Sequence, residues 1–158
     1  MNRTALVSLA AAAFASACAP HKISGTEIDD TDDTRAILDV MEKYRHAMEK
    51  KDAKTVISLL DESFRDEGGT ASPDDDLDYE TAPTKLPALF ASVEDIKMDM
   101  LVRKIDFNDD TKTAVATFTY TESFKLPKFT SKPQSESDIK QMTLKRSGKD
   151  LWKIVSGI

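Results

Sequence analysis

Residues 34–67 have the sequence TRAILDVMEKYRHAMEKKDAKTVISLLDESFRDE, and this stretch decides the fold. In its first half, apolar side chains recur at steps of three and four residues, which is the period of an α-helix with one buried face. That apolar stripe consists of Ile37, Val40, Met41, Tyr44 and Met48. Charged residues fill most of the other positions. We therefore predict an amphipathic helix that is capped by Asp33 or Thr34 and buries its stripe against a large partner.

A second, shorter helix follows the first. Asp52 is a suitable N-cap, because its side chain can accept a hydrogen bond from the backbone of the next turn. Residues 53–60 are too apolar for a helix on the surface, since Val56, Ile57, Leu59 and Leu60 stand close together. Residues 63–67 then predict a short strand that ends at the glycine pair 68–69.

Residues 70–84 contain two prolines and five acidic residues, and they predict a loop. The acidic residues are Asp74, Asp75, Asp76, Asp78 and Glu80. Several carboxylates close together can bind Ca²⁺, but their spacing matches no calcium loop and a charge run is usually solvated. We therefore predict no metal site in this loop.

A third helix follows the loop. Its apolar residues Leu86, Leu89, Phe90 and Val93 have the helical spacing again. Thr84 is the predicted cap, and Pro87 would then lie in the first turn, where a missing backbone N–H is tolerated.

The rest of the chain alternates with a period of two, as strands with one buried face do. The first run, residues 96–107, changes parity near Arg103, which predicts a β-bulge. In the second run, the predicted core face carries Ala114, Ala116, Phe118, Tyr120, Phe124 and Leu126. Two further strands follow, one through Met142 and Leu144 and one through Trp152 and Ile154. Helices followed by antiparallel strands predict an α+β domain whose curved sheet wraps one layer of helices.

The first 17 residues carry one charge, Arg3, and an alanine-rich apolar run that is too short to span a bilayer. They predict an export signal. The sequence Ala15-Ser16-Ala17-Cys18 resembles the bacterial lipoprotein box, in which the cysteine becomes the lipidated first residue. Ordinary signal cleavage after Ala17 is the alternative, because small residues also suit that enzyme. We expect a signal peptide at 1–17, a lipidated Cys18 with a flexible tether at 18–33, and a domain at 34–158.

Composition excludes several functions. A net charge of −6 argues against nucleic-acid binding, which requires a basic surface. The single cysteine rules out an internal disulfide. His21 and His46 stand apart from any cluster of Cys, Ser or Asp, so neither a zinc site nor a hydrolase triad is indicated. We expect no metal and no cofactor.

Short motifs at both ends of the predicted domain form a recognisable set. They are Glu42-Lys43-Tyr44, Lys51-Asp52-Ala53, Leu59-Leu60, Phe64 and Asp150-Leu151-Trp152-Lys153-Ile154-Val155. Together they resemble the nuclear transport factor 2-like superfamily, in particular its SnoaL-like branch. The resemblance covers residues 34–158 and implies a cone with a pocket between the helices and the concave face of the sheet. Members include isomerases, cyclases, dehydratases, assembly domains and proteins without catalytic activity, so the fold alone defines no reaction.

The resemblance to the steroid isomerase branch also implies site residues. Tyr44, eight residues before Asp52, matches the tyrosine that stabilises an oxyanion, and Asp66 or Glu67 lies near the place of the carboxylate that moves the proton. Glu122 and Asp138 share the parity of core residues, but neither clearly aligns with the second oxyanion donor. The expected pocket is lined by Tyr44, Phe118, Tyr120, Glu122 and Trp152. Alternatively, Tyr44 is an ordinary core residue of the apolar stripe.

Three functions remain open. The first is a lipoprotein anchored through Cys18 on the periplasmic side of the cell envelope, at the outer membrane, whose domain is a non-catalytic binding or accessory module for a small apolar ligand. The second is an isomerase or cyclase that uses the cone pocket. The third is a module that dimerises through its sheet, although the outward face of residues 115–123 is mostly Thr and Ser. We expect the first function, and a monomer or weak homodimer.

Overall fold

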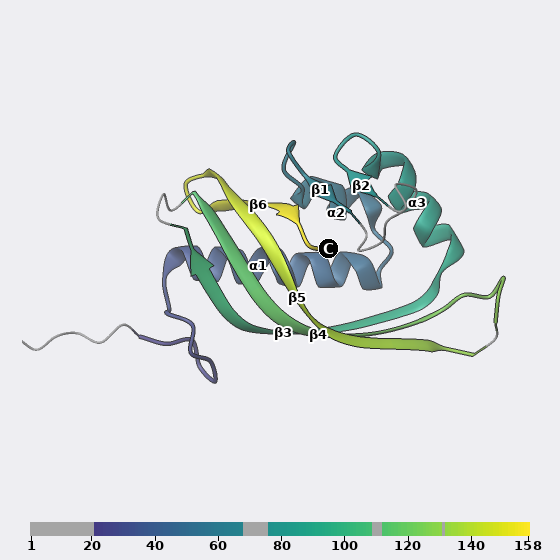
Figure 1. The fold of residues 1–158 in the computed structure, drawn as a ribbon, viewed down its shortest axis with the longest axis horizontal. Coiled ribbons are helices and arrows are strands. Elements are labelled where there is room, and N and C mark those ends of the chain that lie inside the picture. Colours follow the sequence, from purple (N-terminus) through teal and green to yellow (C-terminus); the bar gives the residue numbers. More distant parts are fainter. Residues whose placement is uncertain (1–20, 68–75, 109–111, 131) are drawn as a thin grey trace, which may run out of the picture.

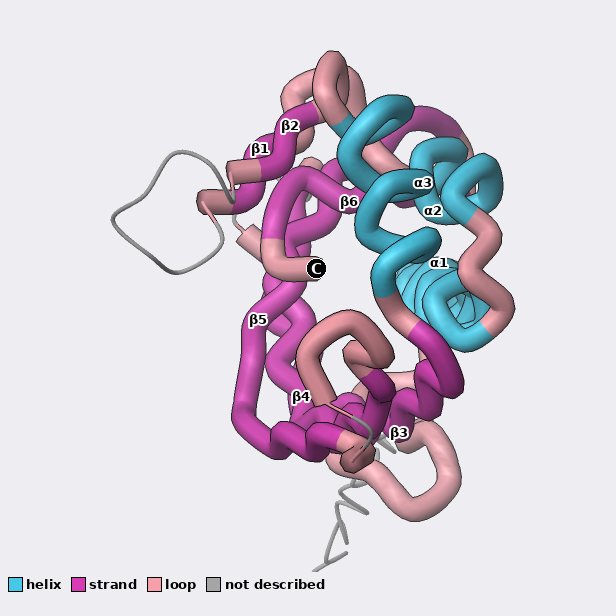
Figure 2. Tube along the Cα trace, turned by 90° about the vertical axis from the view of Figure 1, so that its right-hand side faces the viewer, coloured by secondary structure: helices cyan, strands magenta, loops and turns pink. Residues whose placement is uncertain are grey.

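A layer of three helices packs against one curved sheet. The computed structural model describes residues 21–67, 76–108, 112–130 and 132–158. In chain order the elements are α1 (Asp32–Glu49), α2 (Ala53–Leu59), β1 (Arg65–Asp66), β2 (Leu77–Asp78), α3 (Ala82–Ser92), β3 (Glu94–Phe107), β4 (Thr113–Lys125), β5 (Gln134–Gly148) and β6 (Leu151–Ser156). Strands β3 to β6 form the large antiparallel sheet in that order, and Figures 1 and 2 show it curving around the helices. The predicted α+β cone is confirmed.

Helix α1 begins earlier than we predicted, at Asp32. Its cap is Thr31, whose hydroxyl accepts from the Thr34 backbone at 3.1 Å, while the Thr34 hydroxyl accepts from the Thr31 backbone at 3.0 Å. This reciprocal pair is a capping box. Asp33 is not the cap, because its carboxylate binds Arg146 and Trp152 instead. The predicted stripe is confirmed, since Ile37, Val40, Met41 and Tyr44 are buried.

The chain before α1 is folded in part. Ile23 donates to the Ile28 carbonyl at 2.9 Å, and Ile28 is only 4% exposed. The structure thus differs from the predicted flexible tether at 18–33. Residues 21–31 form a turn that packs on the domain, and residues 32–33 belong to α1. The predicted signal peptide and Cys18 lie outside the described residues. In the part of the chain that the structure describes, no helix is long and apolar enough to cross a membrane.

Asp52 caps α2 as predicted, since its carboxylate accepts a hydrogen bond from the Thr55 backbone at 3.0 Å. The connection between α2 and α3 corrects two predictions. Strand β1 then pairs with β2, which lies inside the predicted loop. Helix α3 starts after Thr81 and not after Thr84, because Thr81 is held in a turn by the carboxylate of Asp78 at 2.8 Å.

Because α3 starts earlier than predicted, its residues take other positions in the helix than we expected. Pro83 occupies the first turn, and Pro87 lies inside the helix. Leu89, which we expected in the buried stripe, is 49% exposed. Of the acidic run, Asp74 and Asp75 lie outside the described residues.

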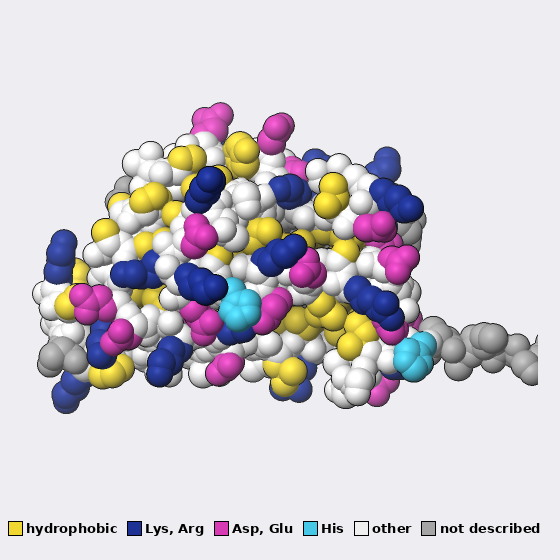
Figure 3. Space-filling view, turned by 180° about the vertical axis from the view of Figure 1, so that it is seen from behind, with side chains coloured by type: hydrophobic (Ala, Val, Ile, Leu, Met, Phe, Trp, Pro, Cys, Tyr) yellow, Lys and Arg dark blue, Asp and Glu magenta, His cyan; other side chains and the backbone are white. Residues whose placement is uncertain are grey.

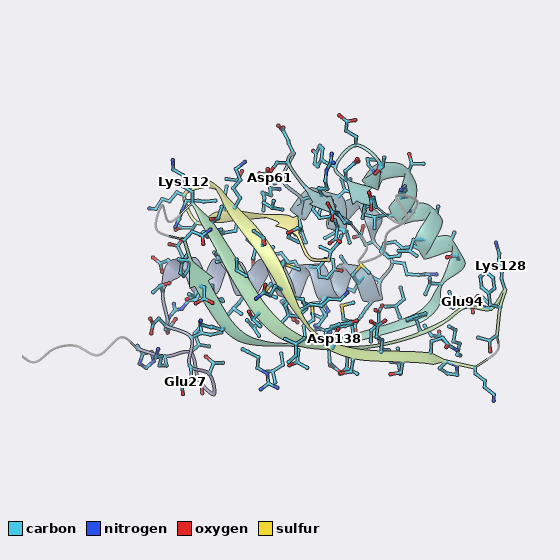
Figure 4. All side chains as sticks on the ribbon, in the orientation of Figure 1. Glu27, Asp61, Glu94, Lys112, Lys128 and Asp138 are labelled. Carbon is cyan, nitrogen blue, oxygen red and sulfur yellow. The ribbon has the colours of Figure 1, made fainter. Side chains whose placement is uncertain are left out.

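The large sheet has the predicted parity. Val102 pairs with Phe118 but Lys104 pairs with Thr117, so Arg103 is the extra residue of a bulge, as predicted. The inward-facing side chains of β4 up to Tyr120 are buried, as are Met142, Leu144, Trp152 and Ile154. Among the described residues, strand β6 pairs with β5 over residues 143–148 alone, and Ile154 of β6 also forms a bridge with Leu60. Beyond β6, β3, β4 and the first half of β5 continue as a long arm, and Figure 4 shows Lys128 at its tip.

Side chains of α1 hold the free edge of β3. Arg45 contacts Glu42 at 2.7 Å and Glu49 at 2.9 Å, and its guanidinium also donates to the Met98 carbonyl at 3.3 Å. The Met98 backbone N–H donates to Glu49 at 3.2 Å. Figure 3 shows this side of the molecule, where acidic and basic side chains are mixed. The contacts fix the spacing between α1 and β3, which form two walls of the site described next.

Candidate functional site

A cavity of about 510 Å³ lies between the helices and the arm of the sheet. This volume is in the range of small-molecule sites, about 300–1,000 Å³. Most of its wall is apolar and comes from α1, α3, β3 and β4. The apolar lining residues are Met48, Leu89, Phe90, Val93, Ile96, Met98, Met100, Phe118, Phe124, Leu126 and Ile158. The cone is thus open at one end and not filled by its own Phe and Met side chains.

One side of the cavity is polar, and strand pairing creates it. Glu122 of β4 stands directly opposite Glu136 of β5, and Phe118 stands opposite Lys140. Directly paired residues of antiparallel strands point to the same face of the sheet. Since Phe118 faces the cavity, Glu122, Glu136 and Lys140 line it too.

Tyr44 reaches this cavity from α1. Its side chain is 4% exposed and lines the wall. Within the described residues its hydroxyl makes no hydrogen bond. Every fully buried side-chain N or O atom in this part of the chain has a hydrogen-bond partner, so the Tyr44 hydroxyl is not fully buried and faces the cavity. Burial raises the pKa of Tyr44, and the negative charges of Glu122 and Asp66 raise it further. The phenol therefore stays protonated and can donate to a ligand.

Tyr120 is already engaged. Its hydroxyl donates to Glu136 across the β4–β5 pair, and the ammonium of Lys140 lies 4.6 Å from the centre of its ring. Burial raises the pKa of Tyr120, and the hydrogen bond to Glu136 raises it further. These three residues form a connected polar group at the rim of the cavity.

Glu122 differs from its neighbours. It is half-buried in the wall, and among the described residues it has neither a hydrogen-bond nor an ion-pair partner. Burial raises its pKa, Lys140 opposes that effect, and Glu136 adds to it. An acid with a raised pKa and an unsatisfied carboxyl facing a cavity is typical of a functional site.

Glu122→Gln should stabilise the protein at neutral pH. A carboxyl whose pKa is higher in the folded state than in the unfolded state destabilises the fold once it ionises. Below its usual pKa of 4.5, both states hold the proton and the substitution should change nothing. As the pH rises from 4.5 to the folded pKa, the extra stability of the variant should grow, and above the folded pKa it should stay constant.

Urea unfolding at pH 4 and pH 8 measures this difference. Glu62→Gln is the control, because Glu62 is exposed and lies outside the cavity. A Glu122→Gln variant that is less stable than wild type at pH 8 would contradict the prediction.

The structure brings together four of the predicted site residues, namely Tyr44, Phe118, Tyr120 and Glu122. Asp66, a candidate base, is half-buried near Tyr44, but its Oδ2 accepts from the backbone N–H groups of Gly157 at 2.8 Å and Ile158 at 2.9 Å. It holds the segment that closes one side of the cavity. Glu67, the other candidate base, is exposed.

Two further candidates lie elsewhere. Trp152 does not line the cavity, because it packs at the other end of the sheet with its ring centre 5.9 Å from that of Phe107. Its indole N–H donates to Asp33 at 3.3 Å, and the Arg146 guanidinium lies 4.7 Å from its ring. Asp138 pairs with Tyr120 in the sheet but is exposed on the curved part of β5 (Figure 4).

Sequence reasoning missed Glu136 and Lys140. Both share the parity of Met142 and Leu144, so the period-two pattern extends back to Gln134. That signal was present, but the first half of β5 is so polar that it did not indicate a strand. Among the residues with described positions, no group of three or more His, Cys, Asp or Glu could hold a metal ion.

Solved structures with the same arrangement of helices and sheet identify the fold. A ketosteroid isomerase-like protein from Erwinia carotovora atroseptica matches with a TM-score of 0.66 and 12% identity over 81% of this chain and 95% of that one. A nuclear transport factor 2-like superfamily protein from Salmonella enterica matches with a TM-score of 0.63 and 12% identity over 78% and 86%. A conserved protein from Planctomyces limnophilus matches with 0.66 and 14% over 79% and 92%.

This chain therefore has the nuclear transport factor 2-like fold, with an open cone cavity. No protein-family model matches the sequence, and no curated protein sequence matches it. At 12–14% identity the likeness shows the fold alone. Any function must be argued from the cavity itself.

Proposed function

We propose that this protein is an exported binding module whose cone cavity holds a small, largely apolar molecule. The observation that carries the proposal is the cavity of about 510 Å³ with an apolar wall and one polar side. Such a site uses apolar area for affinity and a few polar groups for orientation. Here the Tyr44 hydroxyl and the Glu122 carboxyl have no partner among the described residues and face the same space.

The contacts of the two candidate bases favour a non-catalytic role over proton transfer. Asp66 binds the backbone of residues 157–158, and Glu67 is exposed. Within the described chain, no carboxylate forms a hydrogen bond with Tyr44. A binding module needs no such pair, whereas a proton-transfer site needs a base within reach of its substrate.

Binding of a small aromatic alcohol tests the proposal. Titration with 4-phenylbutanol, followed by NMR chemical shifts, should perturb the lining residues and leave the outer face of the sheet unchanged. Leu126→Trp narrows the cavity and should weaken binding at least about tenfold. Leu101→Trp is the matched control, because Leu101 is exposed outside this cavity. No binding at millimolar concentration, or equal effects of the two variants, would contradict the proposal.

The second candidate is an acid–base enzyme of the isomerase or cyclase type. The observation in its favour is that Glu122, whose pKa is raised by burial, faces the same cavity as Tyr44. One relative in structure is described as ketosteroid isomerase-like. A carboxyl with a raised pKa suits proton transfer near neutral pH, and a phenol in a dry cavity suits an oxyanion.

Tyr44→Phe separates the two candidates. Because the hydroxyl has no hydrogen bond in the described structure, its removal should cost less than about 1 kcal/mol of unfolding free energy. A binding module should keep its fold and most of its affinity. An enzyme that uses the oxyanion contact should instead lose turnover by about 10²–10³-fold with its fold intact. Unfolding in urea and turnover of candidate ketone substrates are the two measurements.

We also propose the lipid anchor. Cys18 is the only cysteine and follows Ala15-Ser16-Ala17, a sequence that resembles the lipoprotein box. Cys18→Ser should move the protein from the membrane fraction to the soluble periplasmic fraction and abolish labelling with a fatty acid. If wild type takes up no fatty acid and the variant fractionates as wild type does, ordinary signal cleavage is the correct alternative.

A further inference from the structure

We propose that the ligand of this cavity is a cation, namely a small apolar amine whose ammonium group pairs with Glu122. This inference rests on the proposed binding function and names the chemical class of its ligand. It follows from the charges that line the cavity, from their partners and from the rings around them.

The charged wall has a surplus of negative charge. Among the described residues, the charged side chains that line the cavity are Glu122, Glu136 and Lys140, so two carboxylates face one ammonium. Asp138 follows Glu136 on the same face of β5, opposite Tyr120. Asp66 lies close enough to act electrostatically on Tyr44. A positively charged ligand would reduce this mutual repulsion, and a carboxylate ligand would increase it.

The two paired carboxylates are not equivalent. Glu136 accepts a hydrogen bond from Tyr120, whereas Glu122 is half-buried and has no partner in the described part of the chain. A charged group in such a place is costly unless it is paired. An ammonium brought by a ligand would supply that partner.

One aromatic ring of the wall already contacts a cation. Lys140 already places its ammonium 4.6 Å from the centre of the Tyr120 ring. This contact is a cation–π interaction, which attracts a cation to the face of an aromatic ring. The cavity thus holds one ammonium of the protein itself, beside an apolar space for the body of a ligand that includes Met98, Met100 and Phe118.

Three probes of nearly equal shape test the inference, namely 4-phenylbutylamine, 4-phenylbutanol and 4-phenylbutyrate. At pH 8 the amine is cationic, the alcohol neutral and the acid anionic. Dissociation constants from calorimetry or NMR should rank the amine tightest by at least about tenfold over the alcohol, with the acid weakest.

Two variants with opposite expected effects identify the residue responsible. Glu122→Gln removes the charge, keeps the shape and should abolish the preference for the amine over the alcohol. Lys140→Gln removes the competing ammonium and should strengthen binding of the amine several-fold. Glu62→Gln, an exposed site outside the cavity, controls for net charge and should leave all three constants unchanged.

The outcomes separate this inference from the function on which it rests. If the alcohol binds in the cavity as tightly as the amine, or if Glu122→Gln keeps the preference, the inference is wrong and the binding function stands. If none of the three probes binds at millimolar concentration, both are wrong. The comparison of probes on wild-type protein remains decisive even if a variant fails to fold.

Discussion

Phe64→Ala should lower the free energy of unfolding by about 3–5 kcal/mol. Phe64 is 2% exposed and lies between α2 and β1, where its carbonyl accepts a hydrogen bond from the Tyr79 backbone at 3.2 Å. Truncation removes most of a buried aromatic side chain and leaves a space that rigid neighbours on both sides cannot fill. Urea unfolding should show a lower midpoint with an unchanged slope.

Phe129→Ala is the matched control for this prediction. Phe129 lies in the loop between β4 and β5 and is 83% exposed. The same atoms are removed from a site that water already reaches, so the cost should be less than about 0.5 kcal/mol. Similar losses in the two variants would show that Phe64 is not part of the core.

Gly157→Ala should have the second large effect. Gly157 has φ of +87°, and a Cβ built on it would lie 1.9 Å from the Gln141 carbonyl oxygen. The backbone must therefore move, and both hydrogen bonds from residues 157 and 158 to Asp66 should break. Hydrogen bonds to a charged group contribute about 1.5–3 kcal/mol each, so we expect the loss of both to cost about 3–6 kcal/mol.

Gly25→Ala is the control, because it measures the conformational strain without the steric clash. Gly25 also has a positive φ, of +77°, but a Cβ there would meet nothing within 4 Å. Its cost should be only the conformational strain, about 1 kcal/mol. Hydrogen exchange should accelerate at residues 157 and 158 in the first variant alone. Equal stability of the two variants would mean that the segment beside the cavity moves at no cost.

Local patterns predicted much of the fold. The stripe of α1, the Asp52 cap, the buried face of β4 and the bulge at Arg103 all agree with the structure. Each depends on side-chain direction within one element, which repeats with a period of 3.6 in a helix and two in a strand. The resemblance predicted the cone, and solved structures with the same fold confirm that prediction.

The caps show where local reasoning failed. Thr31, Asp33 and Thr34 are all good capping residues and lie within four positions of one another. Asp33 is excluded by Arg146, a residue 113 positions away, which binds its carboxylate at 2.5 Å. A long-range contact thus decides which of several suitable residues caps the helix, and no local sequence pattern predicts that contact.

The sequence by itself determined which side chains face inward, and so it identified Tyr44, Phe118, Tyr120 and Glu122 as residues of one interior. It could not place Trp152 outside the cavity or bring Glu136 and Lys140 into it. Those positions depend on the register between β4 and β5 and on how far both strands extend beyond β6. A cavity forms where elements that are distant in sequence do not come into contact. The lengths and the curvature of whole strands decide where this happens. Side-chain direction within one strand contains no information about the neighbouring strands, so the sequence pattern alone does not locate the cavity.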